Sequence, residues 1–180
     1  MQRVSVVGTT GSGKSTFAER LAHVINAQAI HLDDLMWLPN WQKRDDEEYT
    51  ALLTRALQEE RWVVDGNTRK SRALVWNNAD TVIWLNYPFW VNFTRLLLRT
   101  LQRIRDKTEI FPGCQESFKT QFFSRDSLLL WFFHTYWRRK KEYRKLFESQ
   151  QFPHLRVIVL EKPRQAHQWL AALTEEEPGL

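Results

Sequence analysis

The chain has 180 residues and a net charge of +5, a length that predicts a single domain over residues 1–180 and a charge that suits an anionic ligand such as a nucleotide or a nucleic acid. Its single cysteine, Cys114, excludes an intrachain disulfide and a cysteine metal site. Because no run of about 18 apolar residues occurs, we expect no membrane span, and we expect a cytoplasmic protein with no signal peptide before the first strand.

Residues 3–7 are a short valine-rich run, which predicts a β-strand. The next eight residues fit the pattern G-x-x-x-x-G-K-[ST], which is typical of a phosphate-binding P-loop: Gly8, Thr9, Thr10, Gly11, Ser12, Gly13, Lys14 and Ser15. Apolar residues at helical spacing over 17–25 predict a helix directly after it. We therefore expect these eight residues and Thr16 to bind the phosphates of ATP.

The P-loop residue types suit that chemistry. Glycines permit positive φ and bring backbone N–H groups close to an anion, and the start of the following helix adds partial positive charge. Lys14 is expected to reach the β- and γ-phosphates and the Ser15 hydroxyl to bind Mg²⁺, so ATP and Mg²⁺ are the predicted cofactors. The alternative is an incidental glycine-rich turn, for which chance matching of the four fixed positions is about one in a hundred.

Residues 28–32 predict a second strand that ends at Asp33. The carboxyl ends of parallel strands face the ligand crevice of an α/β sheet. Asp33 is therefore a candidate to accept a proton from an acceptor hydroxyl or to hold the substrate, and capping of a helix or turn is the alternative. Trp37, in an aromatic stretch, either stacks on a planar substrate or covers the core.

A helix is expected over 45–60 and a buried strand over 62–65, which ends in Asp65. A carboxylate directly after a buried strand is the Walker B pattern, so Asp65 and Ser15 are the predicted Mg²⁺ ligands. The turn that follows lets Asn67 approach the substrate. One of three later cations would hold an anionic group of the acceptor, with Arg72 as our candidate: Arg69, Lys70 and Arg72.

A fourth strand is expected over 81–85, followed by a helix from 89 to about 104. Arg95, Arg99 and Arg103 are four residues apart and so form one stripe on that helix. Three cations in one row repel one another, a cost that an anion would relieve. Arg99 and Arg103 are therefore predicted to stabilise charge on a transferred phosphoryl group, and a solvated helix face is the alternative.

Residues 105–127 are polar and irregular, which predicts a lid over the site. A helix over 128–147 is aromatic first and basic from 138 to 145. That basic stretch either binds nucleic acid or is a solvated helix end whose cations suit the helix dipole. A fifth strand over 156–160 and a helix from Pro163 to about 173 complete the alternating pattern of an α/β fold.

The chain as a whole resembles the adenylate-kinase-like P-loop kinases. It is more similar to a bacterial group called DNA topology modulation proteins, which are regarded as kinases. The matching residues extend over nearly the whole chain: residues 8–15, 31–33, Trp37, 65–67, 79–83, Gly113, Cys114, Glu116 and 157–160. Residues 67–69 differ from the Phe-Pro-Arg of adenylate kinases, which argues against adenylate kinase activity.

The resemblance implies a three-layer α/β fold with a five-stranded parallel sheet in the order 2-3-1-4-5. It also implies an acceptor-binding insertion over 35–60, the lid over 105–127, and Arg99 and Arg103 as the arginines at the base of the lid. The predicted function is ATP-dependent phosphoryl transfer to a small-molecule or nucleotide-like acceptor. The alternative is a nucleotide-binding regulatory protein that affects DNA topology through residues 138–145.

Overall fold

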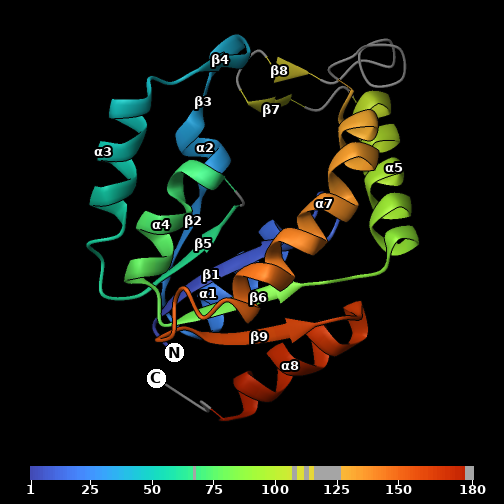
Figure 1. Cartoon of the computed structure of the whole chain (residues 1–180). Coiled ribbons are helices and arrows are strands. Elements are labelled where there is room, and N and C mark those ends of the chain that lie inside the picture. The colour runs from blue at the N-terminus through green and yellow to red at the C-terminus, as the bar shows by residue number, and fades with distance from the viewer. Residues whose placement is uncertain (67, 107–108, 112–113, 116–126, 177–180) are drawn as a thin grey trace.

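The computed structural model describes residues 1–66, 68–106, 109–111, 114–115 and 127–176 (Figure 1). At its centre is a five-stranded sheet made of β1 (Arg3–Gly8), β2 (Gln28–His31), β5 (Trp62–Asp65), β6 (Thr81–Leu85) and β9 (Arg156–Leu160). The strand order is β2-β5-β1-β6-β9, and all neighbours run parallel. Counted in chain order, this is the predicted 2-3-1-4-5 order, so the predicted sheet is confirmed.

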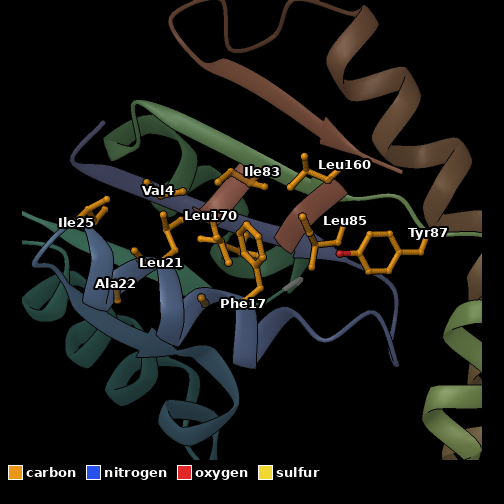
Figure 2. Packing of buried hydrophobic residues seen from close by; sticks show 14 residues of the cluster. Val4, Phe17, Leu21, Ala22, Ile25, Ile83, Leu85, Tyr87, Leu160 and Leu170 are labelled. Carbon is orange, nitrogen blue, oxygen red and sulfur yellow. The ribbon is translucent and has the colours of Figure 1, made fainter. Parts of the chain in front are cut away.

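Helices cover both faces of the sheet, because the apolar side chains of each strand alternate between two cores. On one face, α1 (Lys14–Val24) and α8 (Pro163–Glu176) pack against Val4, Ile83 and Leu85 (Figure 2). On the other face, Val64 and Trp84 contact buried side chains of α3 (Asp46–Ala56), α4 (Arg69–Asn78) and α7 (Leu128–Glu148). The three-layer α/β prediction is confirmed.

The strand expected over 28–32 is one residue shorter, because Leu32 begins the short helix α2 (Leu32–Met36). Asp33 therefore lies in the first turn of a helix instead of at the end of a strand, where its carboxylate suits the positive end of the helix. A small hairpin follows, made of β3 (Trp37–Leu38), the 3₁₀ turn η1 (Pro39–Trp41) and β4 (Gln42–Lys43).

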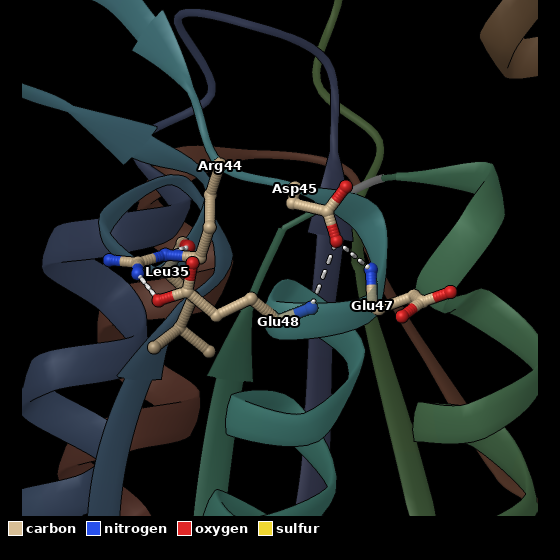
Figure 3. A network of polar contacts seen from close by, with 5 residues as sticks. All are labelled: Leu35, Arg44, Asp45, Glu47 and Glu48. Carbon is tan, nitrogen blue, oxygen red and sulfur yellow. Dashed lines mark hydrogen bonds and ion pairs between the residues drawn. The ribbon is translucent and has the colours of Figure 1, made fainter.

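Polar contacts hold this hairpin between its neighbours (Figure 3). The Arg44 guanidinium donates to the Leu35 carbonyl at 2.8 Å and pairs with Glu48. The Asp45 carboxylate caps α3 by accepting from the backbone N–H groups of Glu47 at 2.9 Å and Glu48 at 3.4 Å. The helix expected over 45–60 thus begins where predicted but ends at Ala56, because residues 57–61 turn into β5.

Helices α5 (Phe89–Asp106) and α7 pack together through a third apolar cluster that contains Leu96, Leu129, Phe132 and Tyr136. Both helices match the predicted ranges within two residues. The segment predicted as a lid contains a small antiparallel hairpin, β7 (Glu109–Phe111) and β8 (Cys114–Gln115), and the rest of 107–126 lies outside the described residues. Within the described part of the chain, no helix combines the length and the apolar character that crossing a membrane requires.

Candidate active site

The P-loop connects β1 to α1 in the conformation that phosphate binding requires. Gly11 and Gly13 both have φ of +82°, and Gly13 caps the start of α1. Lys14 folds back across the loop, where its ammonium donates to the Thr9 carbonyl at 3.3 Å. Two left-handed glycines, the start of a helix and one cation therefore surround the same small space, and this arrangement fits a nucleotide phosphate chain. Thr10 is half-buried, and Ser15 and Thr16 are exposed in the first turn of α1.

Helix α5 forms hydrogen bonds with the P-loop, and the sequence analysis did not predict this contact. The buried Asn92 amide donates to the Thr9 hydroxyl at 2.7 Å, and Arg95 donates to the Ser12 carbonyl at 3.4 Å. A Cβ at Gly11 would lie 2.3 Å from the Asn92 carbonyl oxygen, so the loop and the helix touch. Asn92 could have been identified as a polar residue four positions before Leu96, on the buried face of an amphipathic helix.

Asp65 is buried at the end of β5 with one oxygen 3.4 Å from Nδ1 of His31. The other His31 nitrogen lies 3.5 Å from Glu19. Burial opposes ionisation of Asp65, but the contact with His31, the charge of Lys14 and the neighbouring Ser15 hydroxyl outweigh it and lower its pKa. Asp65 is therefore an ionised carboxylate, as a Mg²⁺ site requires.

These residues fit the predicted Mg²⁺ ion. Oδ1 of Asp65 is buried and accepts no hydrogen bond from the residues that the structure describes, so it is available to a metal-bound water. Among the same residues, no cluster of three or more His, Cys, Asp or Glu side chains forms a metal site. Mg²⁺ at this place would thus depend on the nucleotide phosphates for most of its ligands, with Ser15 and Asp65 as the protein's contribution.

The half-buried Lys14 lies within electrostatic range of four charged side chains. Burial lowers its pKa, the carboxylates of Asp65 and Asp33 raise it, and the guanidinium groups of Arg139 and Arg99 lower it again. The net effect is a lowered pKa. Three predicted site residues, Asp33, Asp65 and Arg99, are thus within electrostatic range of Lys14, and so is Arg139, which was not predicted.

The pKa of Asp33 is raised. Asp33 is exposed to solvent, but desolvation by the neighbouring protein disfavours its charged form, and the carboxylates of Asp65 and Asp34 add to the effect. Lys14 and Arg139 oppose it. A carboxylate with a raised pKa accepts a proton more readily, so this environment suits Asp33 to general base catalysis.

Arg139, on α7, is the second residue that the sequence analysis missed, because it lies within the basic stretch 138–145. It is half-buried, its guanidinium lies 4.7 Å from the Trp131 ring, and burial lowers its pKa. Its helical phase could have identified it: Arg139 follows the buried Phe132 and Tyr136 and precedes the buried Tyr143 at spacings of three or four. Position 139 therefore faces inward.

The three cations after β5 all have acidic partners. Arg69 and Arg72 bind the same carboxylate, Glu142 of α7, at 2.9 and 2.8 Å, and Lys70 pairs with Asp46. Arg72 is the most buried of the three, and its guanidinium lies 5.6 Å from the rings of Trp76 and Tyr143. It lines a cavity of about 10 Å³ next to Gly66, which is room for about one water molecule.

The other predicted residues are placed as follows. Trp37 is half-buried and meets the ring of Trp41 edge-on at 5.8 Å. Arg103 is half-buried on α5, one turn beyond the exposed Arg99. Asn67 lies outside the described residues. A surface hollow of about 860 Å³ lies along the outer face of α3 and contains none of the predicted site residues.

No protein-family model matches the sequence, and no curated protein matches it either. Solved structures do match. Shikimate kinase from Acinetobacter baumannii, in complex with shikimate, superposes with a TM-score of 0.54 and 14% identity, and covers 99% of this chain and 96% of its own. Shikimate kinase from Bacteroides thetaiotaomicron gives a TM-score of 0.55 and 17% identity over 97% of each chain. At this identity the similarity shows that the chain shares the α/β fold of these two structures.

Proposed function

We propose that the chain is an ATP-dependent kinase that phosphorylates a hydroxyl group of a small molecule. One observation carries the proposal: Asp33, a carboxylate with a raised pKa, lies within electrostatic range of Lys14 at the P-loop. A P-loop alone explains nucleotide binding. A proton acceptor beside it is the additional group that transfer to a hydroxyl requires.

In the proposed reaction, the acceptor oxygen bonds to the γ-phosphorus, the bond from that phosphorus to the β,γ-bridging oxygen breaks, and ADP leaves. Asp33 takes the proton of the attacking hydroxyl, while Lys14 and the P-loop N–H groups hold the β- and γ-phosphates. Ser15 and Asp65 would hold Mg²⁺, which neutralises phosphate charge when bound. The proposed role of three arginines is to stabilise charge on the transferred group: Arg99, Arg103 and Arg139.

The proposed acceptor is small and carries a negative charge. Arg139 lies in electrostatic range of Asp33, and Arg72 is largely buried next to Gly66. Glu142 is shared between two arginines, so cations outnumber carboxylates where α4 meets α7. We propose that Arg72 binds this charge and that Trp37 and Asn67 contact the rest of the acceptor. The shared fold with shikimate kinases, one of them with shikimate bound, supports a small acceptor.

The proposal includes membership of the DNA topology modulation group, which the sequence resembles in residues 31–33 and 65–67. The alternative activity, DNA binding through residues 138–145, has weaker support. Arg139 lies within electrostatic range of Lys14 and Asp33, and Glu142 binds Arg69 and Arg72. Exposed cations still occur in this stretch, at Arg138, Lys141, Arg144 and Lys145.

The test is ADP release with Mg²⁺·ATP and a panel of hydroxy acids, polyols, nucleosides and nucleotides. We expect turnover with an anionic hydroxyl compound, and we expect Lys14→Ala to abolish it. Asp33→Asn should lose at least about a hundredfold in kcat, since general base catalysis contributes that much, while ATP affinity measured by calorimetry stays unchanged.

Asp34→Asn is the matched control, because it removes the same charge from the adjacent position in the same helix turn. Its kcat should stay within a few-fold of the wild type. Normal turnover by Asp33→Asn would show that the proposed base is wrong. A chain that turns over no acceptor but binds duplex DNA, with an affinity that falls steeply as salt rises, would support the regulatory alternative.

A further inference from the structure

Helices α5 and α7 expose an unusual amount of apolar surface. Six large apolar side chains are concerned: Trp90 at 69% exposure, Trp137 at 67%, Leu98 at 66%, Phe133 at 48%, Leu130 at 44% and Leu101 at 41%. We call these six residues, with the half-buried Phe89, Phe93 and Leu97, the outer apolar face. Single exposed apolar residues are normal, whereas a contiguous patch marks an interaction site.

Ring contacts connect the aromatic residues of the outer apolar face across both helices. The rings of Trp90 and Phe93 are 6.0 Å apart, and Phe93 is 5.3 Å from Phe133 on the other helix. Phe89 lies 5.6 Å from Phe133 and stacks on Trp137 at 6.3 Å. The buried cluster that contains Leu96 and Phe132 packs the two helices together. The exposed rings of both helices therefore form a single surface above that cluster.

The spacing of these residues is that of a helix–helix interface. On α5, apolar side chains recur at Trp90, Phe93, Leu97 and Leu101, which are steps of three and four. On α7, the same steps separate Leu130, Phe133 and Trp137. Side chains at this spacing interdigitate with those of another helix, and their exposure shows that no described element of the chain covers them.

Two polar side chains within this face already form a hydrogen bond inside their own helix. The Thr94 hydroxyl donates to the Trp90 carbonyl at 2.7 Å, and Nδ1 of His134 bonds to the Leu130 carbonyl at 2.7 Å. Burial of the face would leave these two atoms with their partners. None of the residues of the outer apolar face is charged. The face itself therefore lacks the lysine and arginine side chains with which proteins bind nucleic acids or anionic lipids.

The exposed area matches one half of a dimer interface. Since an aromatic side chain has a surface of about 150–250 Å², Trp90, Trp137 and Phe133 together expose about 400 Å². The three leucines bring the total to about 600 Å² or more, the upper end for a monomer. A standard interface buries about 800 Å² on each partner, of which roughly 60% is apolar, or about 500 Å².

We propose that the outer apolar face binds the same face of a second copy of this chain. The contact would be isologous, as in most homodimers, with two helices from each copy. Tryptophan is the residue most enriched among interface residues that dominate affinity, and Trp90 and Trp137 are the most exposed members of the face. This proposal does not depend on the activity proposed above.

Sedimentation velocity of the full chain over a hundredfold range of concentration tests it. We expect a species of twice the 21.6 kDa chain mass. The double variant Trp90→Gln/Trp137→Gln should weaken association at least about tenfold and leave the circular dichroism spectrum unchanged, because both side chains are already exposed. The control is Trp41→Gln, an exposed tryptophan on η1, outside the face, which should dimerise like the wild type.

A wild-type chain that stays monomeric over the whole range would overturn the proposal. So would a double variant that dimerises as tightly as the wild type. If the double variant does not fold, the concentration series of the wild type still shows whether the chain dimerises. A monomer that binds vesicles of anionic lipid or a single-stranded oligonucleotide, and loses that binding in the double variant, would assign the face to a different partner and contradict the dimer.

Discussion

The Asn92 side-chain amide donates to the Thr9 hydroxyl at 2.7 Å, and both residues are buried. They are separated by 83 positions in the chain, so this hydrogen bond joins the P-loop to helix α5. The same helix touches the loop at Gly11 and Ser12. The shape of the P-loop therefore depends on α5 as well as on its own glycines.

Asn92→Ala should destabilise the fold and weaken nucleotide binding. The substitution leaves the buried Thr9 hydroxyl without its donor, and an unsatisfied buried polar group costs about 1–3 kcal/mol. Chemical denaturation would measure the loss of stability, and titration calorimetry the loss of ATP affinity. Gln102→Ala, at an exposed position of the same helix, should change neither. Wild-type ATP affinity in Asn92→Ala would show that the hydrogen bond does not shape the site.

Gly11→Ala should be more harmful than Gly13→Ala. Both glycines have φ of +82°, and a left-handed conformation costs alanine about 1–2 kcal/mol at either position. Only at Gly11 would the new Cβ meet backbone, 2.3 Å from the Asn92 carbonyl oxygen, whereas at Gly13 the nearest atom is 3.7 Å away on the flexible Arg95 side chain. Denaturation of both variants without nucleotide gives the comparison, and equal losses would contradict the packing of α5 on the loop.

Arg139→Met should lower kcat/KM at least about tenfold, because one charge-stabilising contact of this type contributes that much or more. Methionine keeps much of the volume that packs on Trp131, so the fold should survive. Arg138→Met is the matched control, since it removes the same charge from the exposed neighbour. Steady-state kinetics with the acceptor identified by the panel would measure both. Equal effects of the two substitutions would mean that only the overall charge of α7 matters.

Asp80 should make stability depend on pH in the acid range. Burial opposes its ionisation, but the Thr81 hydroxyl and the backbone N–H groups of Arg3 and Gln2, which donate at 2.6–2.8 Å, lower its pKa. A lowered folded-state pKa stabilises the fold above the unfolded value of about 3.9, and this contribution is lost as pH falls through the folded value.

Asp80→Asn should therefore be less stable than the wild type at pH 7, by about 1 kcal/mol, because Asp80 is a half-buried carboxylate whose interactions are screened by solvent. The difference should shrink as pH falls below about 3.9. Denaturation curves at a series of pH values would measure it. Asp106→Asn serves as control, because Asp106 is exposed and pairs with the adjacent Arg105. A difference that is constant across pH would exclude ionisation as its cause.

The sequence analysis identified the P-loop, the five strands and their order because each depends on local pattern or on a resemblance that extends along the chain. It missed Asn92 and Arg139 for a common reason. Both lie on long helices whose composition is apolar or basic. Their roles depend on the P-loop and its neighbours, which are distant in the sequence. Helical phase would have indicated that both face inward, although it cannot show which segment they meet.

The position of Asp33 was only partly predictable. The sequence of residues 28–32 predicted a strand through residue 32, whereas Leu32 begins α2. Asp33 still lies near Lys14, because the end of β2 is adjacent to the P-loop region through β5 and β1. The ion pairs of Arg69 and Arg72 with Glu142 join residues about 70 positions apart, and no pattern in either segment indicates such a partner.

Two sides of helix α5 make different contacts: one contacts the P-loop, and the other belongs to the outer apolar face. Asn92 and Arg95 hold the nucleotide loop, and Trp90 lies on the outward side of the same first turns. A displacement of α5 along its axis would move the P-loop contacts and the outer apolar face together. Thermodynamic linkage then makes any coupling reciprocal: the factor by which nucleotide tightens self-association equals the factor by which self-association tightens nucleotide. Protein concentration would thereby become a variable of the ATP saturation curve.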